Sequence, residues 1–271
     1  MEVQKDARIS AIDIAKHFGD KASGTLTPVL DGVSMNIQEG EFVVILGPSG
    51  CGKSTFLKIL GGILPASSGK ILIDGTDYGT QVPRELLKRF GFVFQNNNLL
   101  QWRTAAGNLK FMLETMRLKG EAWQGRVSEM LEVVGLQDYQ DVYPHELSGG
   151  MRQRVGIARA LVHDPDVLIM DQPMGALDAI TRQMLTFELL DIWHKTQKTI
   201  IMVTNNVNEA IILGNRVFIF SQVPTKILQE IPIDIPFEER NHQVFSSPRF
   251  LELREKLNHH VRATLSMEEP A

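Results

Sequence analysis

The sequence predicts an α/β domain built on a mostly parallel β-sheet, and three of its features predict this fold. An apolar run at residues 42–46 leads directly into a glycine-rich loop and then into a segment of helical character at residues 54–60. Apolar, strand-like runs alternate with helical segments from about residue 40 to residue 220, which favours a parallel sheet with helical crossovers. Residues 104–145 carry helical periodicity alone, so we expect a helical insertion there.

Local patterns give the order of the elements. A short apolar run between turn residues predicts a strand, whereas apolar residues three and four apart predict a helix. Prolines after Ser221 exclude central strands, so we expect the segment from about Ser221 onward to lie outside the sheet core. The expected strands are 9–14, 33–37, 42–46, 69–75, 92–95, 167–171, 199–203 and 217–220, and the expected helices are 54–60, 83–89, 147–161, 180–196 and 247–263.

The glycine-rich loop reads Gly-Pro-Ser-Gly-Cys-Gly-Lys-Ser-Thr, and its spacing predicts a phosphate-binding site. Glycines let successive backbone N–H groups turn onto phosphate oxygens, and the N-terminus of the following helix adds positive potential. Lys53 would reach the β- and γ-phosphates, and the Ser54 hydroxyl would bind Mg²⁺. The residues expected to hold the phosphates are Gly47, Pro48, Ser49, Gly50, Cys51, Gly52, Lys53, Ser54 and Thr55.

Further polar residues end strands or open a helix. Ser148, Gly149 and Gly150 begin a helix, where free N–H groups bind an anion or the serine serves as an ordinary cap. Asp171 ends an apolar strand, a position from which a carboxylate binds Mg²⁺ through its waters. Gln95 ends another strand with an amide.

Phe18 and Cys51 each have two interpretations. The ring of Phe18, in a loop upstream of the glycine-rich loop, either stacks on adenine or packs as a core or turn residue. Cys51 is the single cysteine, so an internal disulfide is impossible. Its motif contains no histidine to act as a base, which favours a small loop residue over a nucleophile.

Composition and charge exclude several classes of function. The chain of 271 residues is 43% hydrophobic and 22% charged, which is ordinary for a globular protein with a full core. Its 28 basic and 32 acidic residues give a net charge of −4 without a long basic run, so we expect no nucleic-acid partner. No apolar stretch is long enough to span a bilayer, and the first six residues lack a signal-peptide core, so we expect a cytoplasmic location.

The motifs occur in an order that resembles, over nearly the whole chain, the ATP-binding subunit of ATP-binding-cassette (ABC) transporters. Residues 47–55 resemble the Walker A loop, Gln95 the Q-loop glutamine, 147–150 the signature, 167–171 the Walker B strand, and 175–178, ending in Asp178, the D-loop. Leu-Gln-Trp-Arg-Thr at 100–104 and Pro-Ile-Asp-Ile-Pro at 232–236 resemble the nitrate, sulfonate and taurine importer group, although Gln101 replaces its usual proline.

This resemblance implies a P-loop NTPase fold of the ABC cassette type. It has a RecA-like parallel sheet core, N-terminal antiparallel β strands and a helical subdomain at about residues 96–154. Residues 1–220 would form the ATP-binding domain and residues 221–271 a C-terminal extension, so truncation after Ser221 would leave ATP binding measurable. The implied cofactors are ATP and Mg²⁺, with Ser54, Gln95 and Asp171 as metal ligands.

The resemblance also implies partners. Two cassettes, copies or paralogues, would meet head to tail, so that Ser148, Gly149 and Gly150 contact the nucleotide held by the partner. Transmembrane permease subunits would dock at the cytoplasmic face of the inner membrane, and a solute-binding protein would take part indirectly. Trp102 and Arg103 would belong to the permease interface, or Trp102 would simply pack the insertion. The solute would be a small anion or a sulfonate. A soluble ABC-type ATPase that acts as a regulatory or assembly factor is the alternative.

Two residues depart from the family pattern where the chemistry occurs. Gln172 replaces the glutamate that polarises the attacking water, and a neutral amide cannot take that proton. Asn205 replaces the switch histidine. We therefore expect weak hydrolysis at a catalytic set of Gln172, Asn205, Gln95 and Asp178. Gln172 alone fits either natural divergence or a laboratory change that traps ATP, and Asn205 favours divergence.

Overall fold

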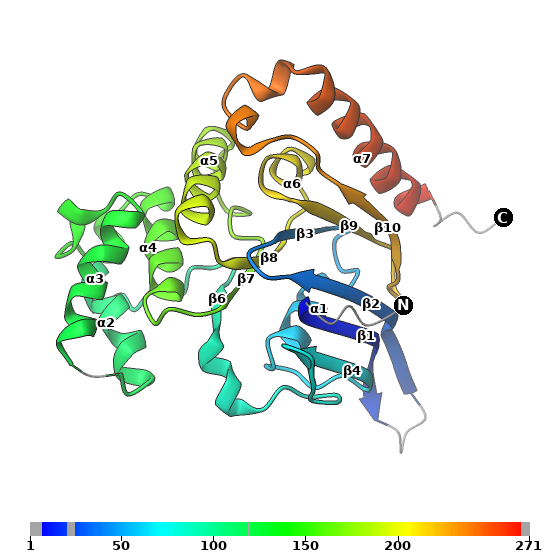
Figure 1. Ribbon diagram of the computed structural model, residues 1–271, viewed down its shortest axis with the longest axis horizontal. Coiled ribbons are helices and arrows are strands. Elements are labelled where there is room, and N and C mark those ends of the chain that lie inside the picture. Colours follow the sequence, from blue (N-terminus) through cyan, green and yellow to red (C-terminus); the bar gives the residue numbers. More distant parts are fainter. Residues whose placement is uncertain (1–6, 21–24, 119, 267–271) are drawn as a thin grey trace. The chain divides into compact units, whose positions relative to one another are not determined.

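The computed structural model, drawn as a ribbon in Figure 1, describes residues 7–20, 25–118 and 120–266, and the chain divides into two compact units. Unit 1 comprises residues 1–87 and 201–271, and unit 2 comprises residues 88–200. The first six residues, in which we found no signal-peptide core, lie outside the described ranges. Across those ranges no helix is long and apolar enough to cross a membrane.

Unit 1 combines antiparallel and parallel strands with three helices among its described residues. Its strands are β1 (Ala7–Asp20), β2 (Thr25–Gln38), β3 (Phe42–Leu46), β4 (Ser68–Ile73), β5 (Thr76–Asp77), β8 (Thr199–Val203, within which the boundary between the units falls), β9 (Arg216–Phe220) and β10 (Ile227–Pro232). Its helices are α1 (Lys53–Leu60), α6 (Val207–Leu213) and α7 (Pro248–Ser266). The 3₁₀ turns lie at Phe237–Glu239, Val244–Ser246 and Arg84–Arg89, and the last of these spans the other point at which the chain passes between the units.

The N-terminal strands form an antiparallel sheet in the order β2-β1-β4-β5, as predicted. The hairpin of β1 and β2 is longer than the pattern suggested, because pairing continues from Ile9 opposite Ile37 to Asp20 opposite Thr25. The strand predicted at 9–14 therefore extends through Phe18. The prediction of a loop at Phe18 was wrong, since a long hairpin satisfies the backbone there without an apolar alternation.

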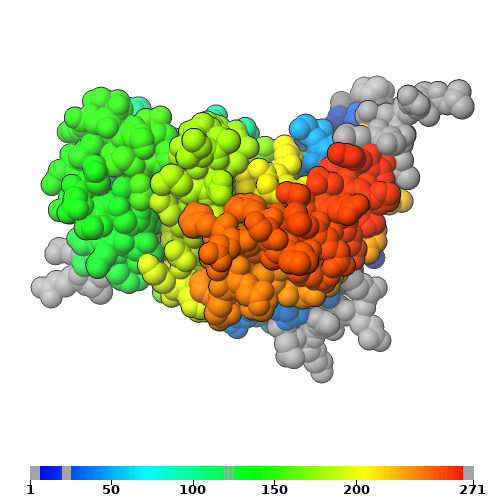
Figure 2. All heavy atoms as spheres, turned by 90° about the horizontal axis from the view of Figure 1, so that it is seen from above, coloured from blue at the N-terminus to red at the C-terminus, as the bar shows by residue number. Residues whose placement is uncertain are grey.

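The strands that carry the glycine-rich loop are parallel. β3 lies between β9 and β8 in the order β10-β9-β3-β8, and its five residues are all buried. β3 pairs with β9 from Val43 opposite Arg216 to Leu46 opposite Ile219. α6 packs on β3, and α7 packs on α6 and β9. Figure 2 shows α7 and the segment before it, in red and orange, on the outer surface of unit 1. The Walker A loop therefore begins, at Gly47, directly after an interior parallel strand.

The chain after Ser221 was expected outside the sheet core, and the structure adds that its first strand joins the sheet at the edge. β10 pairs antiparallel with β9, from Ile227 opposite Phe220 to Pro232 opposite Arg216. The proline argument excludes only central strands, and β10 is an edge strand with its proline at the last residue. The division into a domain of 1–220 and an extension of 221–271 stays a prediction.

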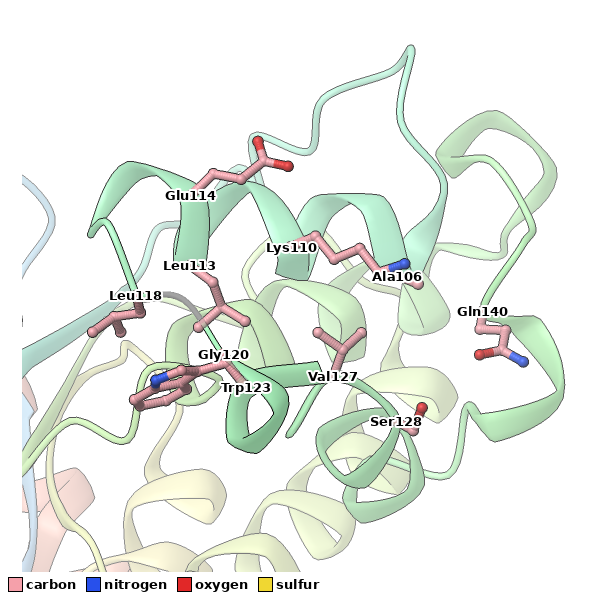
Figure 3. Close-up of a pocket in the computed structure, with 10 residues that line it drawn as sticks. All are labelled: Ala106, Lys110, Leu113, Glu114, Leu118, Gly120, Trp123, Val127, Ser128 and Gln140. Atoms are coloured by element: carbon pink, nitrogen blue, oxygen red, sulfur yellow. The ribbon is translucent and has the colours of Figure 1, made fainter. Parts of the chain in front are cut away.

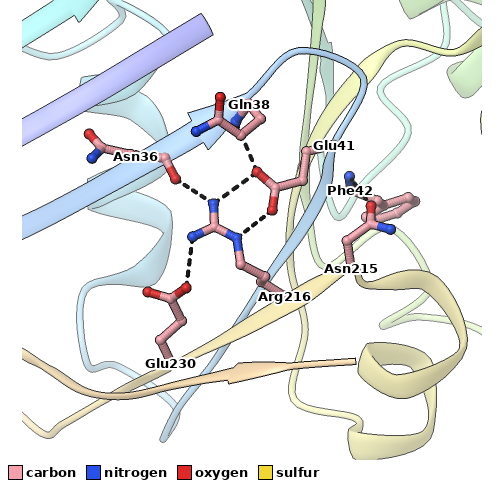
Figure 4. Close-up of polar contacts among 7 residues, drawn as sticks. All are labelled: Asn36, Gln38, Glu41, Phe42, Asn215, Arg216 and Glu230. Atoms are coloured by element: carbon pink, nitrogen blue, oxygen red, sulfur yellow. Dashed lines mark hydrogen bonds and ion pairs between the residues drawn. The ribbon is translucent and has the colours of Figure 1, made fainter. Parts of the chain in front are cut away.

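A charged cluster joins the strands of unit 1 at the start of β9 (Figure 4). The Arg216 guanidinium makes a two-point ion pair with Glu41, with Nη2 2.8 Å from Oε2. It also donates to Glu230 of β10 at 2.8 Å and to the Asn36 carbonyl of β2 at 2.6 Å. A planar guanidinium offers five donors in a fixed fork, so one side chain bonds three strands or strand ends at once. The cluster ties β10 to the sheet.

Unit 2 contains two parallel strands and four helices among its described residues. β6 pairs with β7 from Phe90 opposite Val167 to Val93 opposite Met170. Its elements are β6 (Phe90–Val93), α2 (Ala105–Thr115), α3 (Glu121–Val133), α4 (Gly149–Leu161), β7 (Val167–Asp171) and α5 (Ala179–Thr196), with 3₁₀ turns at Gln137–Tyr139 and Pro144–Glu146.

The predicted helical insertion is present as α2 and α3, which pack with α4 in the green region of Figure 1. Leu109, Val127 and Leu131 are buried between these helices. α4 also packs closely on β6. A Cβ atom added at Gly91 would lie 2.3 Å from the Ala160 carbonyl oxygen, so only glycine permits this approach of strand and helix backbones.

A buried histidine of unit 2 makes stability depend on pH. His163 is 5% exposed, its Nε2 lies 3.2 Å from the Phe90 carbonyl, and within the described part of the chain Nδ1 has no hydrogen-bond partner. Burial lowers the pKa of His163 below its usual value, although Asp164 acts in the opposite direction. The unfolded chain therefore binds more protons as the pH falls through about 6.5, and the folded state loses stability there.

We expect His163→Gln to flatten this dependence, because the amide can donate to Phe90 but does not titrate. The measurement is the free energy of unfolding by urea at pH 7.5 and pH 5.5 for both proteins. The wild type should lose more stability on acidification than the variant. Equal losses would show that other groups, and not His163, set the acid sensitivity.

Candidate nucleotide-binding site

The Walker A loop is held in a conformation that requires its glycines. Gly50 and Gly52 have φ values of +79° and +98°, which side-chain-bearing residues rarely adopt. A Cβ at Gly47 would lie 3.0 Å from the Phe220 carbonyl oxygen, so β9 approaches the loop closely. The loop then enters α1, whose first helical bond runs from Phe56 N to Gly52 O at 2.9 Å. The predicted strand, glycine loop and helix are therefore confirmed.

Lys53 is buried, at 3% exposed, at the start of α1. Its ammonium donates to the carbonyls of Gly47 at 2.8 Å and Pro48 at 2.6 Å. The loop therefore folds around a positive charge that stands where phosphate oxygens would be attracted. Ser54, the next residue, is half-buried in the first turn of the helix.

Cys51 lies inside the loop and is 2% exposed. Burial raises the pKa of its thiol, with the nearby Lys53 acting in the opposite direction. A buried, protonated thiol is a weak nucleophile. Its structure supports the small-residue interpretation.

Phe18 lies in β1 and is 44% exposed, so it is not a core residue. The ammonium of Lys16 lies 5.2 Å from the centre of its ring, at a distance suited to a cation–π contact. Stacking of adenine on Phe18 stays a prediction.

The segment after β8 is anchored by two buried side chains. Thr204 N donates to the Ile45 carbonyl of β3 at 3.2 Å, which brings Asn205 to the same edge of the sheet as the Walker A loop. The Thr204 hydroxyl donates to the carboxylate of Glu209, which is 5% exposed, and accepts a bond from Asn206 N at 3.1 Å. The Asn205 side chain is exposed at the tip of this segment.

Sequence analysis missed the contribution of Thr204 and Glu209. Asn206 caps α6, accepting from Asn208 N at 2.8 Å and Glu209 N at 3.2 Å. An N-cap residue followed three positions later by glutamate is a known signal of a helix start, and it was available in the sequence. That signal did not reveal that Thr204 would donate a hydrogen bond to the glutamate carboxylate.

In unit 2 the Q-loop glutamine and the Walker B turn lie together. β6 and β7 are parallel and in register, so Gln95 and Asp171 leave the sheet at the same edge. A Cβ at Gly175 would lie 3.4 Å from Gln95 Nε2 and 3.3 Å from the Gln172 carbonyl oxygen. Asp171 and Gln172 are half-buried.

Gln172 adopts a φ of +46°, in the left-handed region. Its carbonyl accepts a bond from Gly175 N at 3.0 Å, which closes a tight turn after the strand. A residue without β-branching tolerates this conformation at some cost, and such residues gather at functional sites. The turn therefore fixes the position of the Gln172 Cβ atom and the direction in which its side chain leaves the backbone.

The signature residues begin α4. The Ser148 hydroxyl accepts a bond from Met151 N at 3.2 Å, so it acts as an N-cap, and Ser148 itself is exposed. A Cβ at Gly150 would lie 2.9 Å from Thr181 Cγ2, and one at Gly149 would lie 3.3 Å from Leu177 Cδ2. Both glycines therefore pack the signature against the D-loop and α5 of the same chain. The cap does not exclude a role toward a partner's nucleotide, which stays a prediction.

Asp178 is the N-cap of α5. Its Oδ1 accepts bonds from Thr181 N at 3.0 Å and Ile180 N at 3.1 Å. Hydrogen bonds from Thr181 and Ile180 lower the pKa of Asp178, so it is ionised at neutral pH. In the structure this carboxylate caps a helix, and its catalytic assignment stays a prediction.

The segment after the Q-loop presents an aromatic side chain to solvent. Trp102 is 74% exposed, so it does not pack the helical insertion. Arg103, by contrast, is engaged within unit 2, where it forms an ion pair with Glu114 at 3.0 Å and lies 5.2 Å from the centre of the Phe111 ring.

A cavity of about 540 Å³ opens between α2 and α3 (Figure 3). Apolar side chains of Leu113, Leu118, Trp123 and Val127 line it, with the ammonium of Lys110 at the rim. None of its lining residues is a predicted nucleotide-binding residue, so the cavity is separate from the motifs above.

These observations define a P-loop nucleotide-binding protein with ABC cassette motifs. Residues 30–175, more than half of the chain, match the family described as ABC transporter. The chain belongs to that family, and it is an ABC-type ATPase with the α/β fold expected from its sequence.

Its relatives agree over most of its length. The chain is 40% identical over 264 residues to the taurine import ATP-binding protein TauB of Rhizobium johnstonii, covering 96% of this chain and 99% of that protein. It is 41% identical over 249 residues to the aliphatic sulfonates import ATP-binding protein SsuB of Bacillus cereus, covering 92% and 94%. The predicted resemblance to sulfonate and taurine importers is therefore confirmed.

A solved structure shares the fold. The dimeric, post-hydrolysis state of the ATP-binding cassette MJ0796, bound to ADP and Pi, has a TM-score of 0.70 and 31% sequence identity. It matches 84% of this chain and 100% of its own.

Proposed function

We propose that this chain is the ATP-binding subunit of an importer of sulfonates or similar small anions, and that it works as one of two cassettes on transmembrane permease subunits. The observation that supports this most strongly is its identity of about 40% to taurine and sulfonate import subunits over nearly its whole length. The Walker A loop, built around a buried lysine, supplies the nucleotide site that such a subunit needs. The proposed location is the cytoplasmic face of the inner membrane.

Mg²⁺ fits the donor set that the chain offers. Ser54, Gln95 and Asp171 provide a hydroxyl, an amide oxygen and a carboxylate, which are the oxygen ligands that Mg²⁺ prefers. Few protein ligands suffice, because Mg²⁺ keeps waters and takes phosphate oxygens. When bound, the ion would neutralise charge on the β- and γ-phosphates of ATP. The chain's own residues hold the phosphates and orient the attacking water.

The proposal includes slow hydrolysis at this chain's own Walker site. The side chain of Gln172 starts from a fixed backbone turn beside Gln95, so it is placed to orient a water but cannot accept its proton. Asn205 can donate a hydrogen bond but carries no charge. ATP would therefore bind and close the assembly, and an intact partner cassette would supply most of the turnover.

Trp102 is proposed to contact the permease subunit. Its turn is held from beneath by Asn108, which is fully buried. The Asn108 amide accepts a bond from Leu100 N at 2.8 Å and donates to the carbonyls of Arg103 and Thr104 at 3.1 and 3.0 Å. A rigid turn that exposes a tryptophan loses little conformational entropy on binding, which is a property of interface hot spots.

We expect Trp102→Ala to reduce recovery of the permease complex while ATP affinity is unchanged. The test is affinity purification of the full chain from membranes of the source organism, with the permease quantified in the eluate. Tyr139→Ala, which removes another exposed aromatic side chain of unit 2, is the matched control. Loss of ATP affinity with an intact complex would refute the assignment of Trp102. Absence of any multi-span membrane protein from the wild-type eluate would favour the soluble regulatory ATPase.

A further inference from the structure

Thr225 is a buried polar residue of unit 1 that no nucleotide-binding motif includes. It lies in the turn between β9 and β10, where Pro224 and Lys226 are exposed, yet it is 0% exposed itself. Its hydroxyl donates a hydrogen bond to the carbonyl oxygen of Cys51, 174 residues earlier in the chain and inside the Walker A loop. A side chain from the C-terminal part of the sheet therefore contacts the phosphate-binding loop.

The backbone of Thr225 is fixed on both sides. Its N–H donates to the Val29 carbonyl at 2.9 Å, and its carbonyl accepts from Asp31 N at 3.0 Å. These bonds lay the turn alongside β2 as a short parallel bridge at Leu30. Thr225 is thus held in place independently of its side-chain bond.

A second contact also places the Thr225 hydroxyl against the Walker A loop. A Cβ at Gly52 would lie 2.9 Å from Val29 Cγ1 and 3.4 Å from Thr225 Oγ1. The backbone at Gly52, with its φ of +98°, therefore packs directly on β2 and on the Thr225 hydroxyl.

The geometry of the peptide group gives this contact a consequence. In a trans peptide the C=O and the following N–H point in opposite directions. The hydroxyl bond fixes the Cys51 carbonyl toward Thr225, so the Gly52 N–H points to the other side of the same peptide plane. In a Walker A loop the backbone N–H groups are the ligands of the phosphates.

We propose that Thr225 is a positioning residue for ATP, which orients the peptide between Cys51 and Gly52 so that the Gly52 N–H faces the phosphates. The proposal rests on the assignment of this loop as the ATP site. It adds that the turn before β10 sets nucleotide affinity, although it lies outside the ATP-binding motifs.

The test uses the full chain and three substitutions. Thr225→Val keeps the shape and removes the donor, and Thr225→Ser keeps the donor. Thr264→Val is the control, because Thr264 is 1% exposed and its hydroxyl bonds the Val261 carbonyl within α7. The readouts are the affinity for a fluorescent ATP analogue with Mg²⁺ and the urea midpoint of unfolding without nucleotide.

We expect Thr225→Val to bind the analogue about tenfold more weakly, because a buried carbonyl loses its donor and the peptide is free to rotate. Thr225→Ser and Thr264→Val should bind as the wild type does. If Thr225→Val does not fold, Thr225→Ala, which leaves room for a water at the carbonyl, takes its place against Thr225→Ser.

A lowered unfolding midpoint with unchanged affinity in the valine or alanine variant would overturn the proposal, since Thr225 would then be only structural. Equal loss of affinity in the serine variant would overturn it too, because the hydroxyl would not be responsible. Failure of the wild-type chain to bind the analogue would instead contradict the proposed function.

Discussion

Lys53→Ala is expected to weaken ATP binding severely while the chain stays folded. The ammonium is buried and bonded to the carbonyls of Gly47 and Pro48, so it is held in place at the proposed phosphate site before nucleotide binds. Loss of a buried, hydrogen-bonded charge costs about 2–5 kcal/mol of binding free energy, or a factor of about 30 to several thousand in affinity. Equilibrium titration with a fluorescent ATP analogue measures this directly.

Lys58→Ala is the matched control, because Lys58 is an exposed lysine of the same helix. It should bind ATP as the wild type does, and circular dichroism should show both variants folded. If Lys53→Ala bound the analogue as tightly as the wild type, the assignment of the loop as the nucleotide site would be refuted.

The second large effect concerns the two residues that depart from the family pattern. If the chain pairs only with itself, Gln172→Glu should raise steady-state phosphate release by tens-fold or more, since a positioned base contributes about 10²–10⁴ in rate. Gln172→Glu combined with Asn205→His should raise it further. Glutamate has the shape of glutamine and lacks β-branching, so the φ of +46° at residue 172 suits both equally.

Gln183→Glu repeats the same chemical change at an exposed position of α5 and should leave the rate unchanged. In an assembly with an intact second cassette the gain should be small, because the partner's site already carries the turnover. Substantial hydrolysis by the unmodified chain alone would show that neither substitution limits the rate.

Local sequence was sufficient to predict the elements that carry the motifs. The apolar run of β3 ends at Leu46, and the glycines that follow adopt the positive φ values that only glycine adopts easily. The strand of Asp171 and the helix after Ser148 were likewise predicted by apolar runs and cap residues. The apolar run, the glycines and the cap residue of each element lie within about ten residues of each other, so a local sequence pattern is enough to predict the element.

Contacts between distant segments could not be predicted in the same way. Nothing near Thr225 in the sequence indicates Cys51, and nothing near Glu41 indicates Arg216. Phe18 was placed in a loop because its neighbours lack alternation, whereas pairing with β2 keeps it in a strand. The prolines after Ser221 excluded an interior strand correctly, but an edge strand tolerates them.

The edge strand changes what truncation should do. A chain cut after Ser221 loses Glu230 as a partner of Arg216, and it loses Thr225 from the Walker A loop. The sequence alone predicted that such a chain binds ATP measurably. The structure instead predicts weaker binding and a less stable sheet.

The contact at Gly91 connects β6 to the last turn of α4, and the signature lies at the first turn of the same helix. Because no side chain separates the Gly91 backbone from the Ala160 carbonyl, a shift of β6 at this point is passed directly to the helix. Ser148 precedes Ala160 by about 18 Å at 1.5 Å per residue, so a tilt of α4 by about 5° about Ala160 would displace the signature by about 1.6 Å. That displacement is half the length of a hydrogen bond, enough to make or break every contact that Ser148 could offer to a phosphate. A methyl group at residue 91 would clash with the Ala160 carbonyl and force β6 and α4 apart, which would change the position of the signature at the other end of the helix.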